Sequence, residues 1–193
     1  MGPTPVSAQE VEVGFKGGAN FNDARVPRAG MRRGLSVGAF VNVRGLEWLG
    51  VQVETVYSRR GAGLRSARQS GDIRIDYMDI PVMMRGSVTD PRRRFRFSLM
   101  GGWYYGVEVG CGLTEPPEDP EGAVCDAALP NRGSTDTGPV GALVFDVGLT
   151  GRYYFTVDLR YSRGLLTEWD EEGGDPSSRN FALMAGIGIL LGI

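Results

Sequence analysis

Eight stretches of this chain alternate apolar and polar residues with a period of two. Successive side chains of a β-strand leave on opposite faces, so this period predicts strands rather than helices. In the first stretch Val13 and Phe15 share one parity, while Glu12 and Lys16 occupy the other. The later stretches begin near Leu35, Leu49, Ile73, Phe95, Leu143, Tyr153 and Phe181.

The connections between these stretches are alternately long and short. The expected long ones are residues 22–33, 61–71, 113–137 and 163–179, and the short ones are 45–47, 87–94 and the turn around Gly151. Up-and-down membrane barrels have short turns at the periplasmic end and longer connections outside. The pattern therefore predicts an all-β fold, an eight-stranded antiparallel up-and-down transmembrane β-barrel, with both termini at the periplasmic end.

The size of the apolar face decides between a membrane barrel and a soluble one. Nearly every stretch offers several apolar residues of one parity, as a lipid-facing surface requires. We expect seven of them to face outward: Val13, Phe15, Val53, Leu99, Phe145, Leu159 and Ile187. Aromatic residues flank the apolar bands, as at membrane interfaces: Trp48, Tyr57, Phe95, Trp103, Tyr105, Tyr153, Tyr161 and Phe181. The alternative is a soluble lipocalin-like carrier with these residues around an internal cavity.

The fourth stretch changes phase. Ile75 and Tyr77 share one parity, whereas Met78 and Ile80 share the other. A phase change predicts a β-bulge near Tyr77–Met78, where two residues oppose one. Pro81 cannot donate to the ladder, which also favours an irregularity nearby.

Length and charge limit the remaining possibilities. A chain of 193 residues is expected to form one domain. Its net charge of −2 gives no electrostatic reason to bind nucleic acid. Val6-Ser7-Ala8 before Gln9 is typical of a signal-peptidase site, so we interpret residues 1–9 as the remainder of a signal peptide and 10–193 as the barrel domain. The alternative is a chance run of small residues.

Cys111 and Cys125 are the two cysteines of the chain, and they flank an acidic, proline-rich segment. An even pair that closes a loop in an oxidising compartment is usually a disulfide. We expect this bridge, which is worth about 3 kcal/mol in the chain-entropy model. Two free thiols are the alternative.

Charged residues of the polar parity should face the lumen. An eight-stranded barrel has an interior just wide enough for side chains to fill, so opposite charges there should pair. The expected network is Glu12, Lys16, Arg44, Glu54, Arg85, Arg96, Glu108, Asp146, Asp158 and Arg160. A narrow polar pore or a catalytic carboxylate pair are the alternatives.

Catalytic and metal chemistry find little support. The chain has no histidine, which removes the usual base of a hydrolase and the commonest metal ligand. The segment Gly34–Gly38 matches the nucleophile elbow by letter, but it lies in an alternating stretch rather than a strand-to-helix turn. Two acidic groups in the long connections could bind calcium, although their spacing favours a solvated charge run: Glu115, Glu118, Asp119 and Glu121, then Glu168, Asp170, Glu171, Glu172 and Asp175. No enzymatic activity, catalytic residue, metal or cofactor is expected.

Short motifs along the chain resemble the PorT-like outer-membrane β-barrel domain family in order and spacing. They are Gly14–Asn20, Glu54–Gly61, Tyr77–Val82, Asp146–Leu149, Leu159–Leu165 and Arg179–Phe181. The resemblance covers Glu10 to Ile193, and it implies an eight-stranded barrel in a Gram-negative outer membrane with no assigned reaction. Some members are tied to protein secretion.

These observations lead to one functional expectation. The chain should be a small, monomeric, porin-like barrel with a side-chain-filled polar lumen, surrounded by outer-membrane lipid. Its role should be structural or in surface interaction, with an unidentified protein or ligand at the external loops. A component of transport or secretion is the alternative.

Overall fold

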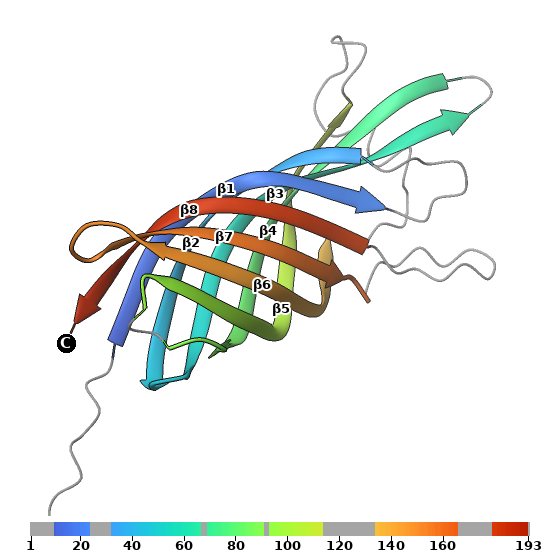
Figure 1. Cartoon of the computed structure of the whole chain (residues 1–193). Coiled ribbons are helices and arrows are strands. Elements are labelled where there is room, and N and C mark those ends of the chain that lie inside the picture. The colour runs from blue at the N-terminus through green and yellow to red at the C-terminus, as the bar shows by residue number, and fades with distance from the viewer. Residues whose placement is uncertain are drawn as a thin grey trace, which may run out of the picture.

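The computed structural model describes residues 10–23, 32–66, 69–90, 93–113, 134–165 and 179–192. Eight strands form one closed barrel in sequence order (Figure 1). They are β1 (Glu10–Asp23), β2 (Arg32–Leu46), β3 (Leu49–Ser66), β4 (Gln69–Ser87), β5 (Phe95–Leu113), β6 (Thr135–Gly148), β7 (Tyr153–Arg163) and β8 (Arg179–Gly192). The predicted eight-stranded antiparallel barrel is confirmed. Among the described residues, no helix is long and apolar enough to cross a membrane.

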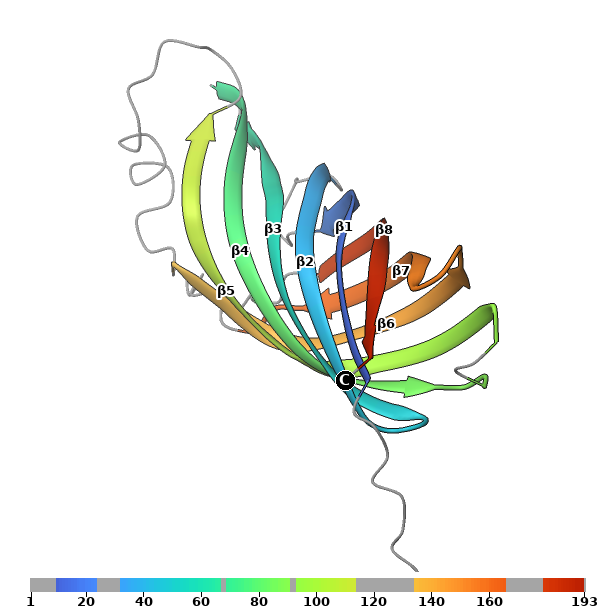
Figure 2. The same cartoon turned by 90° about the vertical axis from the view of Figure 1, so that its left-hand side faces the viewer.

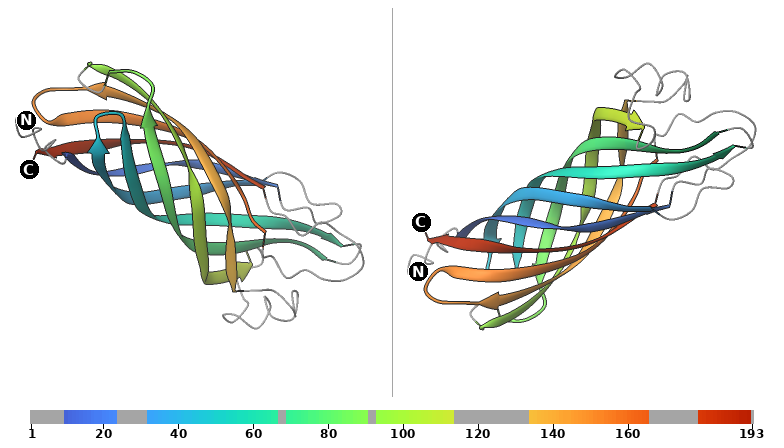
Figure 3. Two further views of the ribbon diagram at one scale, coloured as in Figure 1. Left: turned by 90° about the horizontal axis from the view of Figure 1, so that it is seen from below. Right: turned by 90° about the horizontal axis from the view of Figure 1, so that it is seen from above.

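The first and last strands close the barrel. Each strand pairs with its sequence neighbours, and β1 pairs with β8 in unbroken register from Glu10–Gly192 to Asp23–Arg179. Figure 3 shows the tilted strands from two opposite sides, with the blue and red strands side by side. Closure leaves every strand a partner on both sides, as a sheet surrounded by lipid requires.

Short turns gather at the end of the barrel where β1 begins and β8 ends (Figure 2). The β2–β3 turn occupies residues 47–48, and the β6–β7 turn contains Gly151 with φ of 68°. Glycine adopts this left-handed conformation without the steric penalty that other residues pay. By the usual asymmetry of these barrels this end is periplasmic and the opposite end external.

The predicted long connection at residues 61–71 is wrong. β3 continues to Ser66 and β4 starts at Gln69, and these two strands pair from Val56–Asp79 to Ser66–Gln69. The resulting hairpin extends beyond the neighbouring strands (Figure 1). Its glycine-rich sequence is typical of a loop, but backbone pairing between the two strands needs no apolar face. The strand ends at Asp23, Arg32, Leu113, Thr135, Arg163 and Arg179 agree with the other long connections.

A register shift occurs close to the predicted bulge, but on the partner strand. Pairing between β4 and β5 steps from Asp76–Gly110 to Tyr77–Glu108 and passes over Val109. The extra residue therefore belongs to β5, whereas the phase change in the sequence suggested β4. β4 keeps one register against β3 throughout, which is why no residue is inserted there.

Large apolar side chains cover the outside of the barrel. Phe15 is 75% exposed, Leu99 48% and Phe145 43%, and none of the seven predicted outward residues is buried. A soluble carrier would enclose these residues, so the lipocalin-like alternative is wrong. The exposed apolar surface is what a barrel surrounded by lipid presents.

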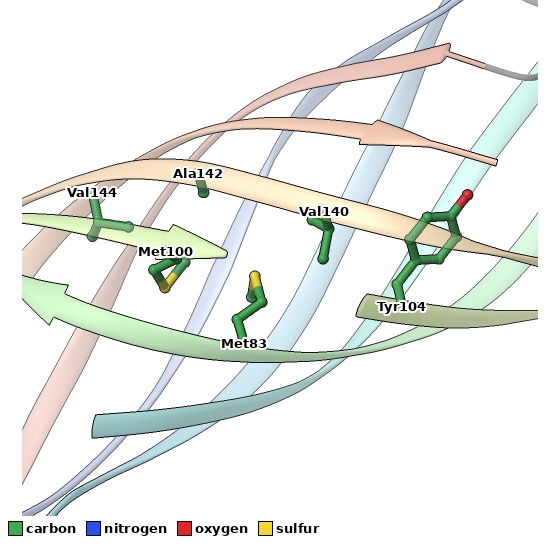
Figure 4. Close-up of a cluster of buried hydrophobic side chains, with 6 residues drawn as sticks. All are labelled: Met83, Met100, Tyr104, Val140, Ala142 and Val144. Atoms are coloured by element: carbon green, nitrogen blue, oxygen red, sulfur yellow. The ribbon is translucent and has the colours of Figure 1, made fainter. Parts of the chain in front are cut away.

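One wall of the interior is apolar, which the sequence interpretation did not anticipate. Side chains from β4, β5 and β6 form a buried cluster (Figure 4). Its members are Met83, Met100, Tyr104, Val140, Ala142 and Val144. Charged, neutral polar and further apolar side chains fill the rest of the described interior.

Candidate functional site

Nine of the ten predicted lumen residues are buried inside the barrel. They form two groups, which we call the inner cluster, near the periplasmic end, and the middle cluster. The inner cluster contains Glu12, Arg44, Arg85, Arg96 and Asp146, and the middle cluster contains Lys16, Glu54, Asp158 and Arg160.

Glu12 on β1 is the centre of the inner cluster. Its carboxylate accepts hydrogen bonds from Arg44 Nη2 at 2.7 Å, Arg96 Nη1 at 2.9 Å and Arg85 Nη1 at 3.3 Å. These donors come from β2, β5 and β4, so one carboxylate joins strands on different sides of the barrel. Asp146 on β6 pairs with Arg85 and, at 3.2 Å, with Arg96 Nη2.

Neutral polar groups complete the shell around Glu12. Asn42 Nδ2 donates to its carboxylate at 3.1 Å, and the hydroxyl of Tyr154 donates at 3.2 Å. The guanidinium of Arg96 also lies 4.6 Å from the centroid of the Tyr154 ring. Glu12 is therefore held by charge and by neutral hydrogen bonds together, which a buried carboxylate needs.

The middle cluster is a closed square of two cations and two anions. Lys16 Nζ lies 2.7 Å from Glu54 Oε1 and 2.6 Å from Asp158 Oδ2. Arg160 lies 2.9 Å from Glu54 Oε2 and 2.7 Å from Asp158 Oδ2. Each charge faces two of opposite sign, so the four charges cancel within the cluster.

Gln52 connects the two clusters. Its amide nitrogen donates to Glu54 at 2.6 Å, and its amide oxygen accepts from Arg85 Nη1 at 3.0 Å. The amide of a glutamine both donates and accepts, so it can stand between a carboxylate and a guanidinium. The inner and middle clusters are therefore one hydrogen-bonded network.

A third group, the outer cluster, was not predicted. Arg60 on β3 pairs with Asp79 on β4 and, at 2.7 Å, with Asp136 on β6. The hydroxyl of Tyr104 donates to Asp136 at 2.8 Å, and the Arg60 guanidinium lies 4.7 Å from the Tyr77 ring centroid. The tenth predicted residue, Glu108, is half-buried opposite Tyr77.

The alternation could have identified the outer cluster. Arg60 lies two residues after the buried Ser58, and Asp79 lies next to the outward Ile80, so alternation places both side chains inside the barrel. The prediction stopped short because it named no lumen residue beyond Glu54 on the third stretch and placed Asp136 in the connection 113–137. Strand length, rather than side-chain chemistry, was the missing information.

Little space remains inside the lumen. A cavity of about 20 Å³ lies between the middle and outer clusters, where Ser58, Arg60, Asp79, Arg160 and Asn180 line it. A cavity needs about 10–15 Å³ to hold one water molecule. This cavity therefore has room for about one water molecule.

Other candidates add no chemistry. Gly34–Gly38 lies within β2, and Asn20 Nδ2 donates to the Ser36 hydroxyl at 2.9 Å, so no nucleophile elbow forms. Cys111 lies two residues before the end of β5, and the described residues contain no free cysteine. Its expected partner Cys125 lies outside the described residues, as do residues 1–9 and both acidic groups, so these predictions stay untested.

Comparison with known proteins identifies a family and several solved structures of similar fold. A family model described as "Outer membrane protein beta-barrel domain" matches residues 7–168. No curated protein matches the sequence.

Three solved structures illustrate the shared fold. OprG from Pseudomonas aeruginosa is 12% identical, with 97% of each chain covered and a TM-score of 0.61. Neisserial surface protein A is 14% identical, with 95% of this chain and 97% of that chain covered and a TM-score of 0.59. Ail, the attachment invasion locus protein of Yersinia pestis, is 9% identical, with 95% and 99% covered and a TM-score of 0.53.

Proposed function

Because this chain belongs to the outer membrane protein beta-barrel domain family, we propose that it is a closed anchor that holds its external hairpin and loops at the cell surface. The barrel lies in the outer membrane of a Gram-negative envelope, with lipid against its outward apolar face. Its role is structural or in surface interaction, and the surface would engage an unidentified protein or ligand. It acts as a monomer and catalyses no reaction.

The filled lumen is the observation that carries this proposal. Glu12, Glu54, Asp146 and Asp158 are each at most 1% exposed, and each is paired with a cation. Removing one partner from a buried ion pair is strongly destabilising, so such a network resists opening. The interior thus favours an anchor over a conduit.

Transport or secretion is the competing function. It would require a water path past the inner and middle clusters, and the cavity of about 20 Å³ beyond them gives no support for one. The order of motifs from Gly14–Asn20 to Arg179–Phe181 supports a finer placement in the PorT-like branch, some members of which are tied to secretion. A secretion role would then use the outer surface or the loops rather than the lumen.

Lys16 provides the test, because it is the single lysine of the chain and is 4% exposed. The folded barrel in detergent is treated with a small water-soluble succinimidyl ester, and modified peptides are identified by mass spectrometry. A closed lumen protects the Lys16 amine until the barrel is unfolded in guanidinium. An open, wet lumen exposes it to the reagent.

The Arg93→Lys variant is the matched control, because Arg93 is exposed in the β4–β5 connection. The introduced amine should be modified in the folded protein, while Lys16 in the same molecule stays unmodified. Modification of Lys16 at a rate within about tenfold of the control amine would contradict the closed anchor and favour transport.

A further inference from the structure

Four arginine side chains project outward from the barrel near its external end. We call them the rim arginines: Arg33 on β2, Arg59 on β3, Arg163 on β7 and Arg179 on β8. Adjacent residues Ser58, Ser162 and Asn180 are buried in the lumen, so alternation directs Arg59, Arg163 and Arg179 to the outside. Arg33 is exposed, and its guanidinium lies 5.9 Å from the ring centroid of Phe21.

The rim arginines lie on β7, β8, β2 and β3, and β1 between β8 and β2 carries Phe21 and Asp23 at this level. Arg163 stands directly opposite Arg179, Arg179 opposite Asp23, and Phe21 opposite Arg33. Strands β7, β8, β1, β2 and β3 therefore carry one continuous arc. Barrel strands tilt by about 35–45°, so positions that step along successive strands in this way stay near one level of the barrel axis.

This level coincides with the external aromatic residues. Tyr57, Tyr161 and Phe181 each lie two positions along the strand from a rim arginine and leave on the same face. Aromatic side chains of this kind mark the headgroup region of a membrane. The guanidinium groups therefore lie at the depth of lipid phosphates or just beyond it.

Within the described part of the arc, arginines outnumber acidic residues. Asp76 lies 3.5 Å from Arg59, Asp23 stands opposite Arg179, and Arg163 has an interaction of its own within the chain. Among the residues whose side chains the structure describes, the four arginines outnumber the one acidic residue paired with them, Asp76. Arg163 and Arg179 are cross-strand partners, so their two guanidinium groups belong to one part of the surface.

Among the described side chains, the arc covers one side of the barrel. At the external ends of β5 and β6 the outward residues include Val107, Val109 and Thr137, which carry no charge. A general attraction to anionic surfaces would not need this asymmetry. A defined lipid site on the β7–β3 side accounts for it.

We propose that the rim arginines bind the phosphate groups of a phosphorylated glycolipid in the outer leaflet. The planar guanidinium presents paired N–H donors that match phosphate oxygens, and it keeps its charge at every physiological pH. The cross-strand partners Arg163 and Arg179 would together hold one phosphate. The apolar side chains below them would contact the acyl chains of the same lipid.

Native mass spectrometry of the detergent-solubilised barrel with bisphosphorylated lipid A tests this proposal. The double variant Arg163→Gln/Arg179→Gln should lower the fraction of lipid-bound protein about tenfold, since each charge-assisted hydrogen bond contributes appreciably to affinity. The control is Arg93→Gln/Arg152→Gln, which removes the same charge from two exposed arginines at the short-turn end. This control should bind like the parent protein.

Dephosphorylated lipid A and inorganic phosphate identify the group that is recognised. Dephosphorylated lipid should bind the parent protein as weakly as phosphorylated lipid binds the rim variant, and free phosphate should compete only weakly. Equal binding of both lipids, or equal loss in the control variant, would overturn the proposal. Heat-modifiable gel mobility shows that each variant is folded, and the single variants Arg33→Gln and Arg59→Gln extend the test if the double variant does not fold.

Discussion

Glu12 shows how single residues hold the lumen together. Five side chains donate hydrogen bonds to its carboxylate, three of them arginines, and its exposed fraction is 0%. An anion with so many donors is stable only while all the charges remain paired. The inner cluster should therefore tolerate loss of its central anion poorly.

Glu12→Ala should destabilise the barrel by about 3–5 kcal/mol, because it leaves buried guanidinium groups with too few anions. Urea unfolding from lipid vesicles, followed by tryptophan fluorescence, measures the change. The control Arg152→Ala lies in the exposed β6–β7 turn and should stay within about 0.5 kcal/mol. A similar small change for Glu12→Ala would mean that water solvates the inner cluster.

Gly188 lies beneath the ring of Tyr154. A Cβ atom at Gly188 would overlap the Tyr154 ring carbons and its hydroxyl oxygen. Gly188→Ala should therefore displace the tyrosine that donates to Glu12, at a cost of about 1–3 kcal/mol from overpacking.

Gly101→Ala is the matched control in β5, because no atom lies within 4 Å of a Cβ atom there. Alanine is favoured over glycine inside a strand by about 0.5–1 kcal/mol, so the control should be neutral or stabilising. Equal unfolding midpoints for the two variants in urea would refute the packing of Tyr154 over Gly188.

Residue parity predicted the direction of many side chains but not their contacts. Glu54 and Arg160 could be assigned to the interior from the sequence, because their neighbours on each strand are apolar. Their direct ion pair depends on which strands face each other across the lumen, and alternation does not contain that information. Tyr154 was missed although its parity is inward.

At the level of elements, the β3–β4 hairpin is the largest departure from expectation. Among the described side chains of β3, Arg60 is the outermost with a lumen contact, and the two strands continue to pair with each other beyond it. Arg60 and Asp79 tie the hairpin base to the barrel. The outer part should therefore be dispensable for folding.

Replacement of residues 62–73 by Asn-Gly tests this. Gly61 and Arg74 are cross-strand partners, and Asn-Gly forms the two-residue turn that such strands favour. The shortened protein should insert into vesicles and unfold within about 1 kcal/mol of the parent, because the ion pairs of Arg60 with Asp79 and Asp136 are retained. Failure to show the heat-modifiable band of a folded barrel would mean that the hairpin takes part in folding.

Turns and register differ in how far a sequence determines them. The tight turn at Gly151 follows from one glycine with positive φ, so it could be predicted locally. The bulge at Val109 could not, since it depends on how β5 pairs with a second strand. A phase change in the alternation of apolar and polar residues shows that two paired strands are irregular. It does not show which of the two strands carries the extra residue.

For the whole molecule, the apolar outer surface and the charged interior together indicate that lipid surrounds the barrel. Along β5, outward Phe95 and Trp103 lie near opposite interfaces, with Leu99 midway between them. The Trp103 indole nitrogen donates to Thr137 Oγ1 at 2.7 Å, so its polar edge is satisfied at the interface. The loss in free energy of unfolding caused by a charge on this face should therefore depend on how deep the charge lies in the bilayer.

Leu99→Arg should destabilise the inserted barrel by about 2–4 kcal/mol, whereas Phe95→Arg should cost about 0–1 kcal/mol for the charge itself. Both variants add one arginine to the same strand and the same face, so they differ mainly in depth. Phe95 also stacks on Phe145 at 6.1 Å between ring centroids, and Phe95→Leu measures that packing loss separately. Urea unfolding from vesicles gives all three values. If the charge lowered the free energy of unfolding equally at both positions, lipid would not surround this face. In water the cost of an exposed charge does not depend on its position along the barrel axis.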